Sequence, residues 1–247
     1  MAIQTRKMSD WLAQNGAAIT NVSKASMLEY MINNLRPLQD GVRIGKIQRE
    51  TWGTYMRCEP WQTTSIGIAQ ADADAIVIQY GGYRLGISLT EPDALSWGSV
   101  ADSSSVGYQT SNDLNTFDGK ARTDAIMKSS YYKNDAPATY AVAYAHAYSK
   151  SHTGDPGGDS SIAAGSWYLP TMGDLALIHQ HFETINLALQ RIKNAGKQTV
   201  SLLQRTYYWS CMEYSGTNAW LLHFGVGHRG YNGKVSNKAH VRPVTAF

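Results

Sequence analysis

Cysteine is scarce in this chain. Its 247 residues include two cysteines, Cys58 and Cys211, which lie far apart in the sequence. Two thiols are too few for a disulfide framework or for a zinc site with four cysteine ligands. The cysteine count therefore excludes both the small disulfide-stapled domains and the cysteine-rich zinc modules.

Charge and long apolar runs are also in short supply. Charged residues make up 17% of the chain, the formal net charge is +3, and the basic residues are scattered. This pattern argues against a nucleic-acid partner. No apolar run approaches the length of a membrane span, and Asp10, Gln14 and Asn15 interrupt the N-terminus. We therefore expect no membrane insertion and no signal peptide, with the chain kept in the cytoplasm unless it leaves within a larger particle.

Aromatic residues are present in an unusual ratio, with 15 tyrosines and 7 tryptophans against 4 phenylalanines. Tyrosine and tryptophan combine an apolar body with a polar group, so they suit half-exposed recognition surfaces as well as core positions. We expect most of them to be half-buried core residues. The hydrophobic fraction of 43% is sufficient for a sizeable core.

The first 64 residues contain a strong helix signal. Ser26 and Glu29 form a capping-box pattern, and Pro37 ends the helix. The apolar stripe of this helix consists of Met27, Leu28, Met31, Ile32 and Leu35. A stripe this strong on a short helix needs a partner, which is either the main domain or the same helix in other copies. Residues 1–64 are therefore predicted to be a helical attachment or oligomerisation segment.

The rest of the chain reads as strands, then helices, then strands. The run Ala75–Ile78 and the alternating Tyr83–Thr90 predict strands, and residues 96–135 look like long loops. A helix is expected from Asp135 to His146, followed by a loop from Ser151 to Gly165. The clearest helix begins at Pro170 and Thr171, is closed by Gly196, and is expected to break near Ile185 and Asn186. The absence of βαβ alternation predicts an α+β fold.

Three local patterns suggest a cofactor-binding or metal-binding site, but the residues around them do not support it. Gly225–Gly230 matches a dinucleotide-binding glycine motif, but no helix or βαβ unit follows it. His179 and His181 are two residues apart on a helix and point in different directions. Asp155 and Asp159 occur in one short acidic turn, which is usually only a turn. We therefore expect no cofactor, no metal and no catalytic residue.

Several short sequence motifs in the C-terminal part of the chain resemble those of a known family. They are Gly165–Leu175 with its Trp-Tyr-Leu-Pro-Thr core, Tyr208–Ser210, Glu213–Tyr214, Asn218–Trp220 and the terminal Val241–Phe247. In this order they resemble the C-type-lectin-fold variable proteins of diversity-generating retroelements, closest to the group of gut bacteria and their phages. The resemblance covers the chain from about residue 65 and is most specific in its last forty residues. It implies a C-type lectin-like domain over residues 65–247, with a variable region at about 208–247.

In that family a reverse transcriptase misreads adenines in a template. Asparagine codons of the template thereby become codons for many other amino acids, while the motifs of the scaffold stay fixed. An AAC codon changed at its adenines can never encode Lys, Glu, Gln, Met or Trp. The resemblance places the variable, ligand-binding positions at Thr217, Leu221, His223, Gly225, Val226, His228, Arg229, Gly230, Tyr231, Gly233, Val235 and Ser236, all of which are permitted types. The excluded types in this region, among them Trp209, Glu213, Trp220 and Lys234, fall at other positions.

Alternation along residues 220–224 predicts which side chains face the core. Trp220, Leu222 and Phe224 would face inward, while Leu221 and His223 would face outward. The glycine-rich stretch from Gly225 to Gly233 is expected to be a loop whose side chains project from the surface. Together these residues would form a mixed apolar and polar patch of the kind that paratopes use.

The resemblance implies a binder and not an enzyme. We expect a protein of a phage virion, at the tail, that binds a protein or glycan on the host surface and contacts other phage particle proteins. A homo-oligomer is expected, with a trimer as the first guess. The alternatives are a structural or decoration protein of the same particle and, less favoured, an enzyme of the formylglycine-generating type, whose broad fold is the same. The Glu-Pro-Asn and Trp-Asn-Asp words of calcium-dependent sugar-binding lectins do not occur in the sequence.

Overall fold

The structure, a computed structural model, describes residues 40–50, 53–62, 72–98, 115–129, 139–149, 165–196 and 198–247, with the backbone alone at 48–50 and 53–57. The predicted N-terminal helix around residues 26–37 lies outside the described residues. The same holds for the Asp155–Asp159 turn and for the expected boundary between residues 64 and 65.

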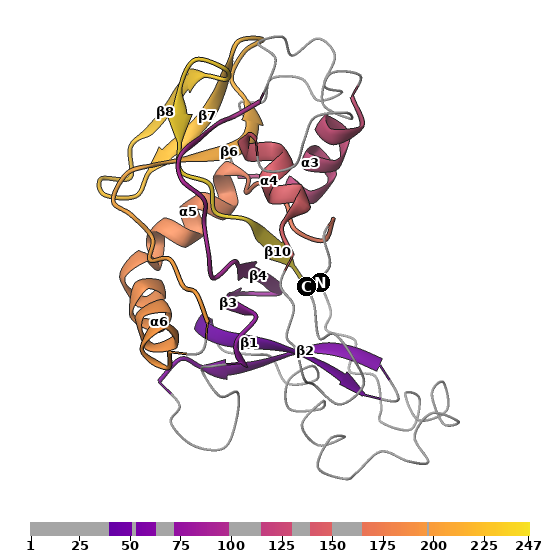
Figure 1. Cartoon of the computed structure of the whole chain (residues 1–247), viewed down its shortest axis with the longest axis vertical. Helices are drawn as coiled ribbons and strands as arrows, with labels where there is room; N and C mark the ends of the chain where they lie inside the picture. The colour runs from indigo at the N-terminus through magenta and orange to yellow at the C-terminus, as the bar shows by residue number, and fades with distance from the viewer. Residues whose placement is uncertain are drawn as a thin grey trace.

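The largest sheet has five antiparallel strands in the order β10-β4-β3-β1-β2. The strands are β1 (Gly41–Glu50), β2 (Gly53–Pro60), β3 (Ala75–Tyr80), β4 (Tyr83–Ile87) and β10 (Val244–Ala246). The predicted strands at Ala75 and Tyr83 are therefore confirmed. Both alternating sets of side chains are buried in β3 from Ala75 to Gln79, because the sheet is covered on both faces. The last strand, β10, brings the C-terminus back to pair with β4 inside the fold (Figure 1).

Two smaller sheets lie beyond this one. The strands β6 (Tyr207–Glu213), β7 (Asn218–His223) and β8 (Arg229–Gly233) form an antiparallel sheet in that order. The short strands β5 (Leu95–Ser96) and β9 (Lys238–Ala239) pair with each other. Figure 1 shows the β6-β7-β8 sheet at the opposite end of the molecule from the β1-β2 hairpin.

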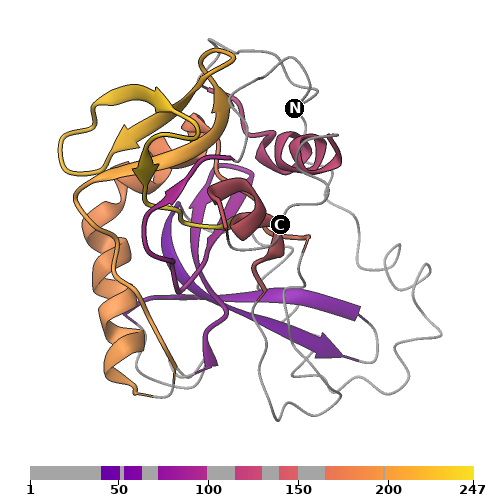
Figure 2. The ribbon, with the colours of Figure 1, turned by 45° about the horizontal axis from the view of Figure 1, so that its top comes forward.

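Four helices are described between these sheets. They are α3 (Gly119–Lys128), α4 (Ala141–Ala147), α5 (Met172–Gln180) and α6 (Phe182–Asn194). Figure 2 shows α5 and α6 along one side of the strands and α3 and α4 on the other. The antiparallel sheets and separate helices confirm the predicted α+β class. In the part of the chain that is described, no helix has the length and apolar character needed to cross a bilayer.

The structure corrects three sequence expectations about the helices. Residues 119–128, predicted as loop, form α3, which lacks a regular apolar stripe because it buries Arg122 and Thr123 beside Ile126. The helix α4 begins at Ala141 and not at Asp135, and Tyr140 precedes it in an extended conformation. The break in the long helical segment falls at His181 and not at residues 185–186, because His181 leaves helical geometry and ends α5.

The contacts at the start of α5 explain why a helix begins at the Leu-Pro-Thr motif of residues 169–171. The Thr171 hydroxyl accepts from the Asp174 amide at 3.0 Å, and the Asp174 carboxylate accepts from the Thr171 amide at 2.9 Å. This reciprocal pair satisfies two amides that the first helical turn leaves without partners. Pro170 in turn accepts through its carbonyl from the Cys211 amide at 2.8 Å, which joins the helix start to β6.

Candidate functional site

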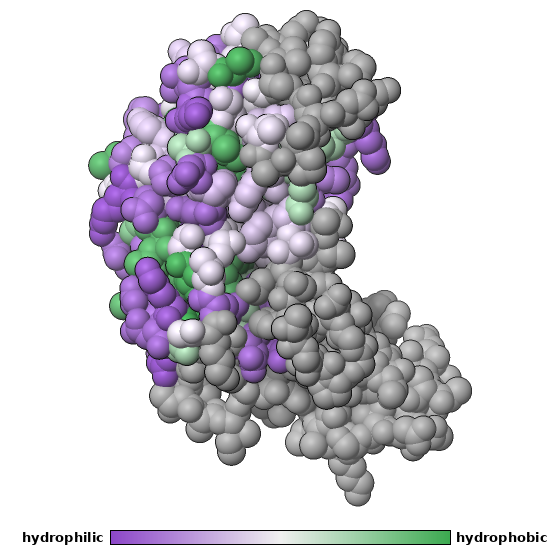
Figure 3. All heavy atoms as spheres, in the orientation of Figure 1, coloured by the Kyte–Doolittle hydropathy of each residue, from purple (hydrophilic) through white to green (hydrophobic). Residues whose placement is uncertain are grey.

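The candidate site is the outer part of the β6-β7-β8 sheet, where the predicted variable residues gather (Figure 1). The exposed members are Thr217, Val226, His228, Arg229, Tyr231, Val235 and Ser236. His223, Gly225, Gly230 and Gly233 are half-buried, and Leu221 is buried. The structure thus brings all twelve to one end of the molecule and presents most of them to solvent. Figure 3 shows that the surface at this end is mainly hydrophilic with isolated hydrophobic residues.

The prediction that Leu221 points outward is wrong. Its side chain is 4% exposed, as is that of the adjacent Leu222. In register, Leu221 lies between Trp209 of β6 and Gly230 of β8, and Trp209 is fully buried. Simple alternation fails at Leu221 because both faces of the sheet are covered at this point, which a pattern with a period of two does not reveal.

Trp220 also departs from its prediction as a core residue, because it is half-buried. It pairs in register with Tyr231, and its ring meets the rings of Tyr214 and Tyr231 edge-on at 5.0 and 6.1 Å. The rings of Tyr214 and Tyr231 stack in parallel with centroids 3.7 Å apart. Tyr214 and Tyr231 are 38% and 52% exposed, so this three-ring cluster offers aromatic surface to a partner.

A second aromatic cluster lies at the other end of the same strands. The Tyr207 ring contacts His223 edge-on at 4.7 Å, and its hydroxyl lies 3.1 Å from Nδ1 of His228. The Nδ1 of His223 accepts from the Gly225 amide at 3.0 Å. Two predicted variable histidines are therefore held around one tyrosine that was not among the predicted site residues.

The stretch from Gly225 to Gly233, expected to be a loop, is only partly a loop. After a turn at Phe224–Val226, residues 229–233 form β8, which pairs with β7. The turn is closed by the Gly227 amide, which donates to the His223 carbonyl at 2.8 Å. Gly227 has a φ of 68°, and a Cβ there would lie 2.9 Å from Nε2 of His179, so a larger residue is disfavoured twice.

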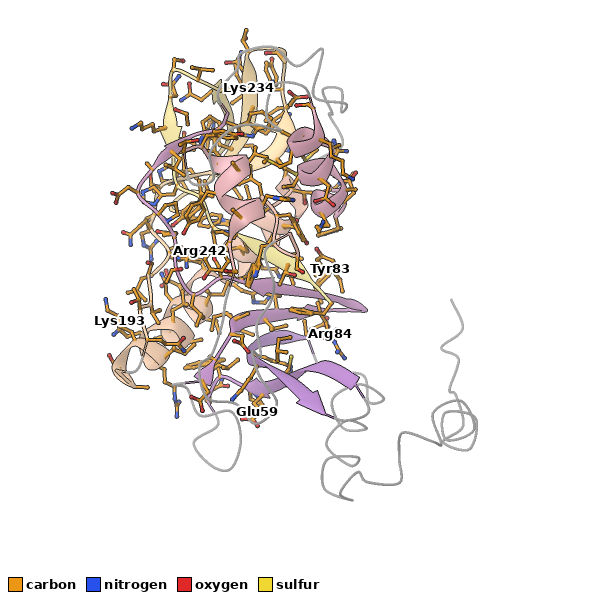
Figure 4. All side chains as sticks on the ribbon, turned by 45° about the vertical axis from the view of Figure 1, so that its right-hand side comes forward. Glu59, Tyr83, Arg84, Lys193, Lys234 and Arg242 are labelled. Atoms are coloured by element: carbon orange, nitrogen blue, oxygen red, sulfur yellow. The ribbon has the colours of Figure 1, made fainter. Side chains whose placement is uncertain are left out.

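Lys234 is the one buried side chain between Gly225 and Lys238. Its ammonium group forms an ion pair with Glu213, donates to the Gly216 carbonyl at 2.9 Å and lies 4.9 Å from the centroid of the Trp97 ring. Its amide and carbonyl bond to Thr217 and Trp97, both at 2.9 Å. Figure 4 shows Lys234 among the strands of this end. Sequence reasoning excluded Lys234 from the variable set but did not identify this anchoring role.

A second buried network fixes the base of the sheet. The Arg242 guanidinium donates to the Ser88 carbonyl at 3.0 Å and lies 3.0 Å from Oε2 of Glu91. The Tyr208 hydroxyl donates to the same carboxylate, also at 3.0 Å. Burial, followed by the nearby Glu91 charge, raises the pKa of Tyr208 well above its usual range. Arg242 appears near the centre of the molecule in Figure 4.

The described residues offer little of what catalysis by cysteine needs. Burial raises the pKa of the Cys211 thiol well above its usual range and that of Cys58 to about 11. Reactive cysteines show the opposite shift and partial exposure. No group of three potential metal ligands occurs among the described residues. His179, considered as a ligand above, lies with Nδ1 3.2 Å from the Phe224 carbonyl oxygen.

The comparisons with known proteins give a structural likeness but no family. No protein-family model matches the chain, and no curated protein matches it. Among solved structures, the chain is similar to a fimbrial protein from Bacteroides ovatus, with 14% sequence identity and a TM-score of 0.49. The match covers 85% of this chain and 49% of the fimbrial protein, so the chain spans about half the length of that protein.

Proposed function

We propose that this chain is a ligand-binding protein of the retroelement-diversified, C-type-lectin-like kind, and that its ligand site is the outer part of the β6-β7-β8 sheet. One observation carries the proposal. Residues of the fixed motifs are mostly buried, as Trp209, Glu213 and Arg242 are, although Tyr214 and Trp220 are not. Positions at which the resemblance allows variation are mostly exposed, as Val226, Arg229 and Tyr231 are.

This separation is what a diversified binder needs. A surface side chain away from special contacts changes stability by about 0.5 kcal/mol or less when substituted, whereas a buried anchor costs several times more. Exposed positions therefore tolerate many residue types without loss of the fold. Among the predicted variable positions, Leu221 departs from this pattern because its side chain is buried.

The biological setting is proposed from the same resemblance. The chain would belong to a phage tail, bind a protein or glycan of the host surface and assemble as a homo-oligomer, with a trimer as the first expectation. Light scattering on the full chain tests the oligomer, and a monomer would contradict it. A neighbouring reverse-transcriptase gene with a near-identical template repeat would separate this proposal from a decoration protein or an enzyme.

The decisive experiment replaces the exposed variable residues and the half-buried His223 with asparagine, the presumed template state. The changed set is Thr217, His223, Val226, His228, Arg229, Tyr231, Val235 and Ser236, and Leu221 is kept because it is buried. We expect a folded protein by circular dichroism that no longer binds the host cells, or the recovered ligand, that the parent binds. A variant that folds and binds as well as the parent would place the ligand site elsewhere.

A further inference from the structure

A groove with a volume of about 890 Å³ lies next to the variable face but uses none of its residues. It lies between the segment Glu91–Ala94 and the segment Val200–Thr206, which Figure 1 shows running from α6 up to β6. Its polar lining includes Glu91, Asp93, Lys193, Gln204, Arg205 and His240. All these residues belong to the scaffold and not to the variable set.

The floor of the groove is rigid. The Glu91 side chain is 6% exposed and is held by the Tyr208 hydroxyl, by Arg242 at 3.0 Å and by Nδ1 of His240 at 3.3 Å. The Glu91 amide is fixed as well, because it donates to the Ser201 hydroxyl at 3.4 Å. A carboxylate held by three partners at the base of a groove keeps one geometry, which lowers the entropy cost of binding a ligand there.

The groove is lined by residues that lie near both ends of α6. Arg205 marks one end, because its guanidinium pairs with Glu183 and lies 5.3 Å from the Phe182 ring in the first turn of α6. Lys193 marks the other end, in the last turn of the same helix (Figure 4). Lys193 lies ten positions after Glu183 along α6, which corresponds to a rise of about 15 Å. A linear ligand fits this shape better than a compact one.

The charges in the groove are balanced. Arg205 is paired with Glu183, and Glu91 is paired with Arg242. Lys193 and Asp93 contribute one formal charge of each sign. A lining that is neutral in sum but rich in donors and acceptors suits a neutral ligand with many hydroxyl groups, since each hydroxyl both donates and accepts.

An extended peptide fits less well, because the wall does not offer a strand edge. The amides of Ser201, Leu203 and Gln204 donate inward, to the Leu89 carbonyl, Asn186 and the Tyr208 hydroxyl at 2.8 to 2.9 Å. Strand addition needs such amides to face the incoming chain. The groove therefore presents mainly side-chain groups on this wall.

From this geometry we propose that the groove binds a neutral oligosaccharide chain, at a site separate from the variable face. The contacts would come from Asp93, Lys193 and Gln204 at the rim and from His240 above the buried Glu91. The proposal is independent of the retroelement interpretation, because it uses scaffold residues alone.

The test uses the full chain and three neutral probes: maltohexaose, cellohexaose and the N-acetylglucosamine hexamer. Titration calorimetry and saturation-transfer NMR measure binding to the parent and to Asp93→Ala and Gln204→Ala, whose side chains are exposed and whose loss leaves the core intact. Asn232→Ala, an exposed amide on β8, is the matched control.

We expect saturable binding of at least one neutral probe, weakened about fivefold by each groove variant, as for the loss of one hydrogen bond, and unchanged in Asn232→Ala. Binding of none of the neutral probes would overturn the proposal. So would binding restricted to an acidic comparator, hexagalacturonate, or an equal loss in Asn232→Ala. The asparagine-substituted variable face should keep this binding, which separates failure of the groove from failure of the ligand face.

Discussion

Lys234 and Glu213 form a buried ion pair that joins the outer hairpin of the candidate site to the body of the protein. The two side chains are 0% and 2% exposed, and they flank the β7-β8 hairpin in sequence, because Glu213 ends β6 and Lys234 follows β8.

Lys234→Met should destabilise the protein by about 3–5 kcal/mol, because it removes one partner of a buried pair and leaves the Glu213 carboxylate without its cation. Urea denaturation followed by tryptophan fluorescence measures the change. Lys238→Met is the control, since Lys238 is exposed on β9 and should change stability by less than about 0.5 kcal/mol. Equal losses in the two variants would show that the pair has no anchoring role.

Lys234→Met combined with Glu213→Leu should recover part of the lost stability. Replacing both charges removes the cost of one uncompensated buried charge, which is the larger part of the single-variant effect. The measurement is a double-mutant cycle on the free energy of unfolding. Additive losses from the two single changes would contradict direct coupling between these residues.

Trp209→Ala should cost about 3–5 kcal/mol, because Trp209 is fully buried and its indole donates to the Leu95 carbonyl at 2.9 Å. Tyr231→Ala should cost about 1 kcal/mol or less, because that side chain is 52% exposed and loses only its contacts with other rings. Thermal melts compare the two variants. A Tyr231 loss as large as that of Trp209 would assign Tyr231 to the core.

Leu221→Asn should destabilise the fold more than Arg229→Asn, although both positions belong to the predicted variable set. Leu221 is 4% exposed, so the change removes a buried apolar side chain and buries an amide, at a cost of about 2–5 kcal/mol. Arg229 is exposed. Melting temperatures of the two variants decide this, and similar values would contradict the burial of Leu221.

Asp174 should make stability depend on pH in the acid range. Burial raises its pKa to about 6, although hydrogen bonds from Thr171 and Tyr83 lower it. A raised pKa means that the folded state holds the proton more tightly than the unfolded state. The stabilisation is therefore complete below about pH 4 and is lost as the pH rises through about 6, by roughly 2–3 kcal/mol.

The matched variant for this prediction is Asp174→Asn, which keeps an acceptor for the helix cap. The unfolding free energy of the parent should decrease relative to that of this variant as the pH rises from about 4 to about 6. Denaturation curves at several pH values measure it. A difference that does not change with pH would show that Asp174 titrates alike in both states.

The sequence predicts some elements of this fold well. The helix start at Pro170 and Thr171 was predicted because it depends on local chemistry, and the apolar run Ala75–Ile78 indicates a buried strand. The helix α3 was missed because its buried side chains include Arg122 and Thr123, whose burial depends on tertiary contacts. Leu221 was wrongly predicted to face outward for the same kind of reason, because the residues that cover the second face of its sheet are distant in sequence.

The candidate site was predicted in outline but not in detail. The variable positions came from the resemblance, and most of them are exposed, whereas the fixed motifs include buried residues such as Trp209 and Glu213. Tyr207 and Tyr214 were missed as site residues. Their exposure and ring contacts arise only when β6 is placed beside β7 and β8, which no local pattern encodes.

The ion pair between Glu213 and Lys234 fixes the open end of the β7-β8 hairpin, whose turn lies at Phe224–Val226. For a flexible loop, each doubling of length costs only about 0.6 kcal/mol of closure entropy. Insertions at its exposed turn near Val226 should thus leave the rest of the protein undisturbed. The turn around Val226 can in this sense differ in length from one variant to the next, while the buried residues of β7, among them Leu221 and Leu222, stay in place.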